Sequence, residues 1–179
     1  MKLNGMEING KKNLFSTKML ATLGILLAMD IVLTRFLSIN AWNIRIGFGF
    51  VPVVISGMLF GPLPTLVVAA LADFLGAILF PTGPYFPGFT LTAALTGLIF
   101  GFFLHKNPGV RNSVFAVLLV QFVLGLLLNT YWIHLLYHSP FVPLLATRVV
   151  QSAFLSVVQF VTIRALAQIS ERVFKKVIA

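Results

Sequence analysis

Six stretches of apolar residues follow one another along this chain, with few polar residues inside them. They span residues 19–37, 48–63, 64–80, 88–104, 113–136 and 143–169. A helix needs about 20 apolar residues to cross a bilayer, and only helices or closed barrels satisfy every backbone polar group in lipid. The sequence therefore predicts an all-α membrane protein, a bundle of six transmembrane helices.

The composition excludes a water-soluble domain. Hydrophobic residues make up 59% of the chain and charged residues only 9%, whereas soluble domains carry roughly 25% charge. The net charge of +9 does not indicate a nucleic-acid partner, because the basic residues are dispersed at the ends of the apolar stretches. We therefore expect a multi-pass membrane protein, surrounded by the lipid bilayer.

The second and third stretches are short for a crossing, and GPLP at 61–64 separates them. Together they are too long for one kinked transmembrane helix. We expect a tight helical hairpin here.

The basic residues predict the orientation, because positive charge concentrates on the cytoplasmic side of membrane proteins. With six crossings, three basic clusters fall on one side: Lys2, Lys11, Lys12 and Lys18; Lys106 and Arg111; Arg172, Lys175 and Lys176. Both termini are thus expected in the cytoplasm. The predicted organisation is a cytoplasmic N-terminal extension (1–18), a substrate-binding transmembrane domain (19–170) and a basic cytoplasmic tail (171–179).

Four charged residues lie inside the apolar stretches: Asp30, Arg35, Asp73 and Arg148. Each costs about 2.5 to 3.5 kcal/mol on insertion scales, so such residues face the interior of a bundle. They either pair internally to lock the bundle or line a polar pocket. Arg35 and Arg148 are expected near the outer ends of their helices, close to Arg45 on the first outer loop, and arginine binds carboxylates through its planar fork of donors.

Polar side chains also repeat at helical spacing in the last two stretches. Gln121, Gly125, Asn129 and Trp132 share one face of the fifth, and Arg148, Gln151, Ser152 and Gln159 share one face of the sixth. Amides exposed to lipid would lack partners, so these faces are expected to point inward. They serve either interhelical hydrogen bonding or ligand binding, and Trp132 is either an interfacial aromatic residue or part of the pocket.

Two further features allow alternative interpretations. The loop PTGPYFPG at 81–88, with Tyr85 and Phe86 at its centre, is either a rigid lid over the outer mouth or a plain interfacial turn. Ala21, Gly24 and Ala28 form a stripe of small residues that lets another helix approach closely. That helix belongs either to this chain or to another subunit.

No pattern of catalytic residues is persuasive, so we expect no enzyme. His134 and His138 have a metal-ligand spacing but no third ligand nearby, and no metal site is predicted. The chain also lacks a GxxxxGK[ST] motif for binding ATP.

Several segments resemble a known family. LTRFLSI, RIGFGFVPVVISGMLFGP, ADFLGAILFPTGPYFPGFTLTAALTGLIFG and LNTYWI are similar to the folate-specific S components of energy-coupling factor (ECF) transporters. The likeness runs from the first stretch to the sixth. Where the family's first helix carries AxxxA, this chain has Gly24 and Ala28.

The resemblance implies a multi-pass protein of the bacterial plasma membrane, an S component that captures folate with high affinity on the outer face. It would dock on a transmembrane T component and two ATPase subunits, and ATP used by those partners would drive toppling and release inside. The chain itself would hold no cofactor. An S component for another vitamin, such as riboflavin, and an intramembrane protein without a transport role are the alternatives.

Folate's chemistry then distributes tasks among the candidate residues. Asp73 and Asn129 suit the N–H donors of the pterin edge, and the side chains of Phe48, Phe50, Tyr85 and Trp132 suit its flat ring. Arg35, Arg45 and Arg148 suit the carboxylates of its glutamate tail, and Gln151 is a further binding candidate. The stripe of Ala21, Gly24 and Ala28 would contact the partner subunits.

Overall fold

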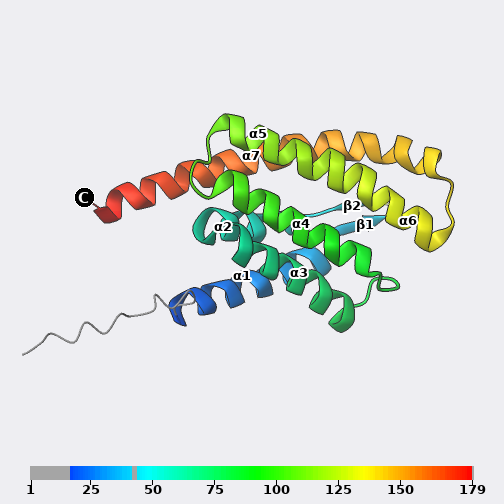
Figure 1. Ribbon diagram of the computed structural model, residues 1–179, viewed down its shortest axis with the longest axis horizontal. Helices are drawn as coiled ribbons and strands as arrows, with labels where there is room; N and C mark the ends of the chain where they lie inside the picture. The colour runs from blue at the N-terminus through cyan, green and yellow to red at the C-terminus, as the bar shows by residue number, and fades with distance from the viewer. Residues whose placement is uncertain (1–16, 42–43, 179) are drawn as a thin grey trace, which may run out of the picture.

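The computed structural model describes residues 17–41 and 44–178, with side chains described at 17–38 and 47–169. These residues form helices and one small hairpin (Figure 1). The helical elements are α1 (Thr17–Arg35), α2 (Phe50–Phe60), α3 (Pro62–Leu79), α4 (Pro87–Leu104), α5 (Val110–Leu118), η1 (Leu119–Leu128), α6 (Asn129–Tyr137) and α7 (Phe141–Ile178). The prediction of a helical membrane protein is confirmed. Most of the predicted N-terminal extension lies outside the described residues.

Five helical segments in the described part of the chain are long and apolar enough to cross a membrane. They are Thr17–Arg35, Pro62–Leu79, Pro87–Leu104, Val110–Tyr137 and Phe141–Ile169. The helix α2 is apolar but has only 11 residues, about 16 Å at the rise of an α-helix. The predicted bundle of six helices is compatible with this arrangement, although α2 is too short to span the hydrocarbon layer alone.

The predicted hairpin between the second and third stretches is present, and it turns at Gly61. This glycine ends α2, begins α3 and has φ +82°, a conformation that residues with a Cβ rarely adopt. Pro62 follows at the first position of α3, where its missing N–H is not needed. The break therefore falls at the start of GPLP, before the predicted boundary.

Two features were not predicted. Strands β1 (Ile39–Ala41) and β2 (Ile44–Ile46) form an antiparallel pair in which Ile39 opposes Ile46, where only a loop was expected. The long helical segment from α5 to α6 contains the π-helical turns of η1. The amide of Asn129 donates to the carbonyl of Leu124, five residues back, instead of four as in an α-helix.

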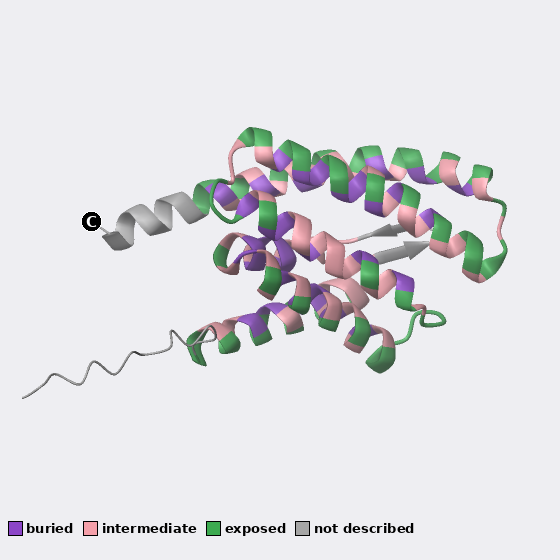
Figure 2. Cartoon of the chain, in the orientation of Figure 1, coloured by how far each residue is buried: buried purple, intermediate pink, exposed green. Residues whose placement is uncertain are grey.

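The closest helix packing joins α3 and α4. A Cβ on Gly97 would lie 2.5 Å from the carbonyl oxygen of Thr65 and 3.0 Å from the Cβ of Ala69, so only glycine permits this approach. The apolar core lies beside this contact, and Figure 2 shows buried residues gathered between the helices there. It consists of Val53, Val54, Ala69, Phe100, Leu104, Ala116, Val117, Val120 and Ile163.

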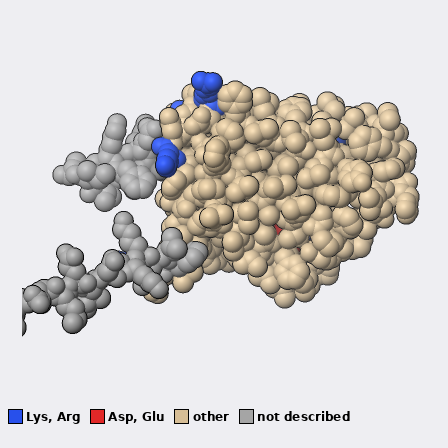
Figure 3. Space-filling model, viewed as in Figure 1, with Lys and Arg blue, Asp and Glu red and all other residues tan. Residues whose placement is uncertain are grey.

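The outside of the bundle is apolar, as a lipid-facing surface must be. Leu63, Phe102, Val142 and Val150 are each more than 70% exposed, and the face in Figure 3 is almost free of charge. The start of α1 and the end of α7 lie at the same end of the bundle, beside the α4–α5 connection (Figure 1). The α3–α4 loop and the α6–α7 turn lie at the opposite end.

Candidate binding site

A cavity of about 290 Å³ lies between the helices. It draws residues from α1, α2, α3, α4, α6 and α7, and from the segments that flank the β-hairpin. Its lining is Asp30, Thr34, Ser38, Gly47, Gly49, Phe50, Val53, Ala69, Ala72, Asp73, Ala93, Thr96, Asn129 and Gln159. Apolar side chains and a few convergent polar groups are typical of small-molecule sites.

Asp30 brings a buried carboxylate to the cavity. Its side chain is 8% exposed, and its Oδ1 accepts a hydrogen bond of 2.8 Å from the hydroxyl of Thr34, one turn along α1. Ser38, a further four residues on, donates to the backbone carbonyl of Thr34. The spacing of four residues places Asp30 and Thr34 on one side of α1, and the bond from Ser38 to Thr34 keeps Ser38 beside them. Asp30 was predicted to face the bundle interior but was not named as a binding residue.

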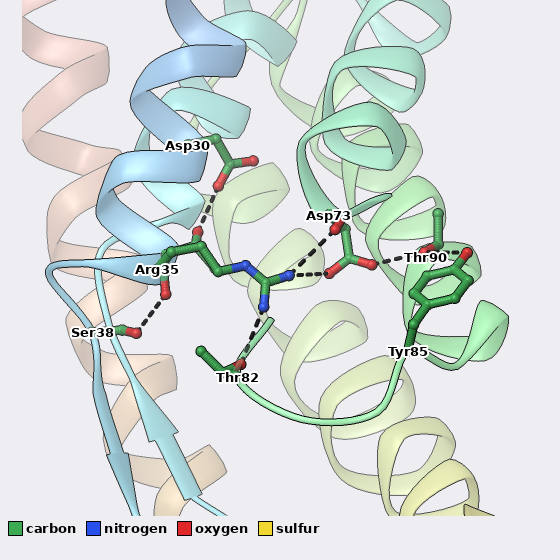
Figure 4. Close-up of polar contacts among 8 residues, drawn as sticks. Asp30, Arg35, Ser38, Asp73, Thr82, Tyr85 and Thr90 are labelled. Carbon is green, nitrogen blue, oxygen red and sulfur yellow. Dashed lines mark hydrogen bonds and ion pairs between the residues drawn. The ribbon is translucent and has the colours of Figure 1, made fainter. Parts of the chain in front are cut away.

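Asp73 is held by a network that links three segments (Figure 4). Its carboxylate lies 3.8 Å from Nη2 of Arg35 and accepts a hydrogen bond of 2.8 Å from the hydroxyl of Thr90. The same guanidinium donates to the backbone carbonyl of Asp73 and, through Nη1, to the hydroxyl of Thr82. Two of the four predicted intramembrane charges, Arg35 and Asp73, thus pair with each other. For these two residues, internal pairing was the first of the two predicted alternatives. Arg35 lies beside the cavity lining, not within it, among the described residues.

Asn129 and Gln159 supply acceptors to the cavity from α6 and α7. The Oδ1 of Asn129 and the Oε1 of Gln159 are buried, and neither has a hydrogen-bond partner among the described residues. A buried acceptor without a partner is costly, which makes these two oxygens suited to N–H donors of a ligand. Both lie on the polar faces that the helical spacing predicted.

The predicted aromatic residues are distributed unevenly around the site. Phe50 lines the cavity, whereas Phe48 is 53% exposed and packs against it with ring centroids 6.2 Å apart. Tyr85 lies on the α3–α4 loop, against Phe74 and within hydrogen-bond distance of Thr90. Neither Tyr85 nor Phe48 is among the described lining residues.

Trp132 fastens the same loop to the bundle. Its Nε1 donates to the hydroxyl of Thr92 at 3.1 Å, and its ring contacts Phe86 with centroids 5.6 Å apart. The α3–α4 loop is therefore held on one side by Trp132 and on the other by the bond from Arg35 to Thr82. Trp132 itself is not among the described residues that line the cavity.

Arg148 and Gln151 both lie on α7. Arg148 is 9% exposed, and its Nη2 donates to the carbonyl of Gly125 in η1 at 3.2 Å. Neither residue belongs to the lining as far as it is described. The backbone of Arg45 pairs with Asn40 in the hairpin, but its side chain lies outside the described part of the structure.

The stripe of small residues faces outward. Ala21, Gly24 and Ala28 are exposed on α1, and a Cβ on Gly24 would have no described atom within 4 Å. Within the described residues, no helix of this chain occupies that surface at Gly24. The alternative of a partner from another subunit remains a prediction.

The comparison with protein families defines the class of this protein. Residues 14–169 match the family described as the S component of the ECF-type riboflavin transporter, and the chain belongs to this family of ECF transporter S components. The resemblance noted in the sequence is confirmed. Because the family consists of transporter subunits, the prediction that the chain is not an enzyme and lies in the cell membrane is confirmed as well.

Individual relatives narrow the class. The folate transporter FolT of Clostridium novyi (strain NT) is 43% identical over 134 residues, which cover 74% of this chain and 78% of that protein. FolT of Leuconostoc mesenteroides subsp. mesenteroides is 31% identical over 125 residues, covering 69% and 67%. A crystal structure of FolT bound with folic acid superposes with a TM-score of 0.82 at 32% identity, covering 86% of this chain and 94% of that one.

Proposed function

We propose that this chain is the folate-binding S component of an ECF transporter. The observation that carries the proposal is the likeness, at a TM-score of 0.82, to FolT bound with folic acid, together with a cavity whose lining suits a pterin. The alternative of a membrane protein without a transport role is disfavoured by the family membership.

The cavity favours a particular direction for folate. Its interior offers Asp30, Asn129 and Gln159 as acceptors, which suit the adjacent N–H donors of the pterin edge, and Phe50 offers an aromatic face to the ring. Its volume of about 290 Å³ is at the lower end of the usual range of about 300 to 1,000 Å³. The ring therefore enters and the anionic glutamate tail extends toward the mouth, away from the two carboxylates.

The outer mouth is assigned to the end that carries the α3–α4 loop, with both termini in the cytoplasm. The exposed Lys106 and Arg111 lie at the end shared by the termini, which supports this orientation. Arg45, Phe48, Tyr85 and Trp132 then belong to the outer half, where Arg45 is proposed to meet the glutamate tail.

We propose that the subunits that hydrolyse ATP and drive transport are separate chains. The exposed stripe of Ala21, Gly24 and Ala28 would dock on a transmembrane T component that carries two ATPases. ATP hydrolysis there would drive toppling and release of folate inside. This chain contributes the pocket and the docking surface, and needs no cofactor of its own.

Ligand binding to the purified full-length protein tests the proposal. We expect folate to raise the melting temperature, and riboflavin and thiamine to leave it unchanged. Asn129→Ala is expected to weaken folate binding by about 1–3 kcal/mol, because it removes a buried acceptor from the site. Isothermal titration gives the affinities.

Asn112→Ala is the matched control, because Asn112 donates to the carbonyl of Asn107 at the opposite end of the bundle. Its folate affinity is expected to equal that of the wild type. Stabilisation by riboflavin and not by folate would favour the vitamin named in the family description and contradict the proposal.

A further inference from the structure

Arg148 is a buried cation that bonds to the backbone of a neighbouring helix. It lies on α7, and its Nη2 donates to the carbonyl oxygen of Gly125, inside η1, at 3.2 Å. A guanidinium at membrane depth is costly, and charge-assisted hydrogen bonds are stronger than neutral ones. The contact therefore joins a buried cation of α7 directly to the backbone of η1.

The bond coincides with the π-helical register of η1. In an α-helix the amide of Asn129 would donate to the carbonyl of Gly125, four residues back. Here it donates instead to Leu124, five residues back. The carbonyl of Gly125 is thus released from Asn129 and is instead bonded by Arg148.

This register decides where Asn129 points. Asn129 follows η1 directly, lines the cavity, and holds its unbonded Oδ1 there. If η1 took the α-helical register instead, its turns would hold one residue fewer, and the helix that follows would be rotated by about 100°. Asn129 would then leave the cavity wall.

We propose that Arg148 is a positioning residue: by bonding the Gly125 carbonyl it holds the π-helical register that presents Asn129 to the ligand. This inference rests on the proposed function and gives Arg148 a role other than binding the glutamate carboxylates. The two roles make different demands on the ligand. A residue that binds the two glutamate carboxylates matters for folate but not for pteroic acid, which has the same ring and only a benzoate carboxylate. A residue acting through Asn129 matters equally for both.

The test compares folate and pteroic acid on the purified full-length protein. Arg148→Met is expected to weaken the binding of both ligands by the same factor, about 10- to 100-fold. Arg148→Lys keeps a cationic donor and is expected to weaken the binding of both ligands less. Arg164→Met is the matched control. Arg164 lies further along α7 and also donates to a backbone carbonyl, that of Pro108 at 2.7 Å, so its variant should bind both ligands normally.

A double-mutant cycle separates positioning from general damage. The double variant Asn129→Ala, Arg148→Met is expected to bind folate no more weakly than Asn129→Ala alone, because both substitutions remove the same contact between Asn129 and the ligand. Additive losses would overturn the inference. So would a loss confined to folate with pteroic acid unaffected, which would show that Arg148 holds the tail.

A thiol-labelling experiment tests the register without any ligand. The natural chain contains no cysteine, so Asn129→Cys places a single thiol at the cavity wall. A small methanethiosulfonate reagent is expected to label it several-fold more slowly when Arg148→Met is added, and at the same rate when Arg164→Met is added. An unchanged rate with Arg148→Met would overturn the inference. If the protein binds no folate but the rate falls, the proposed function fails and the register role stands.

Discussion

Arg35 and Asp73 show how two side chains make charge tolerable at membrane depth. The guanidinium contacts the Asp73 carboxylate, the Asp73 carbonyl and Thr82, and Thr90 contacts the second carboxylate oxygen. Buried ion pairs are tolerated when further hydrogen bonds satisfy the remaining donors and acceptors. The charge of Asp73 is thus balanced within the chain, while Asp30, which also lines the cavity, accepts a hydrogen bond from Thr34.

Arg35→Met is expected to destabilise the protein by about 3 kcal/mol, because it leaves a partly buried carboxylate without its counter-charge. Adding Asp73→Asn should recover most of this loss. Thermal unfolding in detergent measures both. Arg111→Met, at an exposed arginine near the Phe115 ring, is the control and should change little. If the double variant is no more stable than Arg35→Met, the pair is not the source of the effect.

The residue types at the site were predictable, but their partners were not. Helical spacing placed Asn129 and Gln159 on inward faces, and the cost of charge in lipid placed Asp73, like Asp30, in the interior. The sequence carries no information on depth or rotation between helices, so it did not show that Arg35 reaches Asp73 or that Asp30 lines the cavity. The repeat of polar residues at Asp30, Thr34 and Ser38 is the signal that would have identified this wall.

At the scale of elements, α3 and α4 are brought together by Gly97. Gly97→Val is expected to destabilise the protein by about 1–3 kcal/mol, because the added atoms overlap the α3 backbone at Thr65. Gly24→Val is the matched control, since it is also a helical glycine but meets no described atom. Thermal unfolding compares the two. Equal melting temperatures would show that α4 shifts freely and would contradict the tight contact.

Helix positions were predictable because hydropathy and Gly–Pro breaks depend only on residues that are close together in the sequence. The α2–α3 hairpin, for example, follows from GPLP. The β-hairpin and the π-helical turns of η1 were missed for a physical reason. Strands of three residues carry almost no periodicity, and the register of η1 depends on Arg148, which lies far along the chain.

At the scale of the whole molecule, the proposed function assigns folate binding and subunit docking to different surfaces. Gly24→Trp is expected to leave folate affinity unchanged, because Gly24 is exposed and absent from the described cavity lining, and to abolish folate uptake by cells that carry the partner subunits. Met29→Trp is the control. Met29 is also exposed and lies about 100° further round the helix than Ala28, so uptake should persist. Normal uptake with Gly24→Trp would exclude the stripe as a docking surface.

The helix α7 is much longer than a bilayer requires. Its 38 residues extend about 57 Å, whereas the hydrocarbon layer is about 30 Å thick, and its apolar segment ends at Ile169. The remainder continues the same helix beyond the apolar segment, and this helix carries Gln159 in the cavity lining. A subunit bound to this extension from outside the lipid would therefore contact the same helix that lines the cavity.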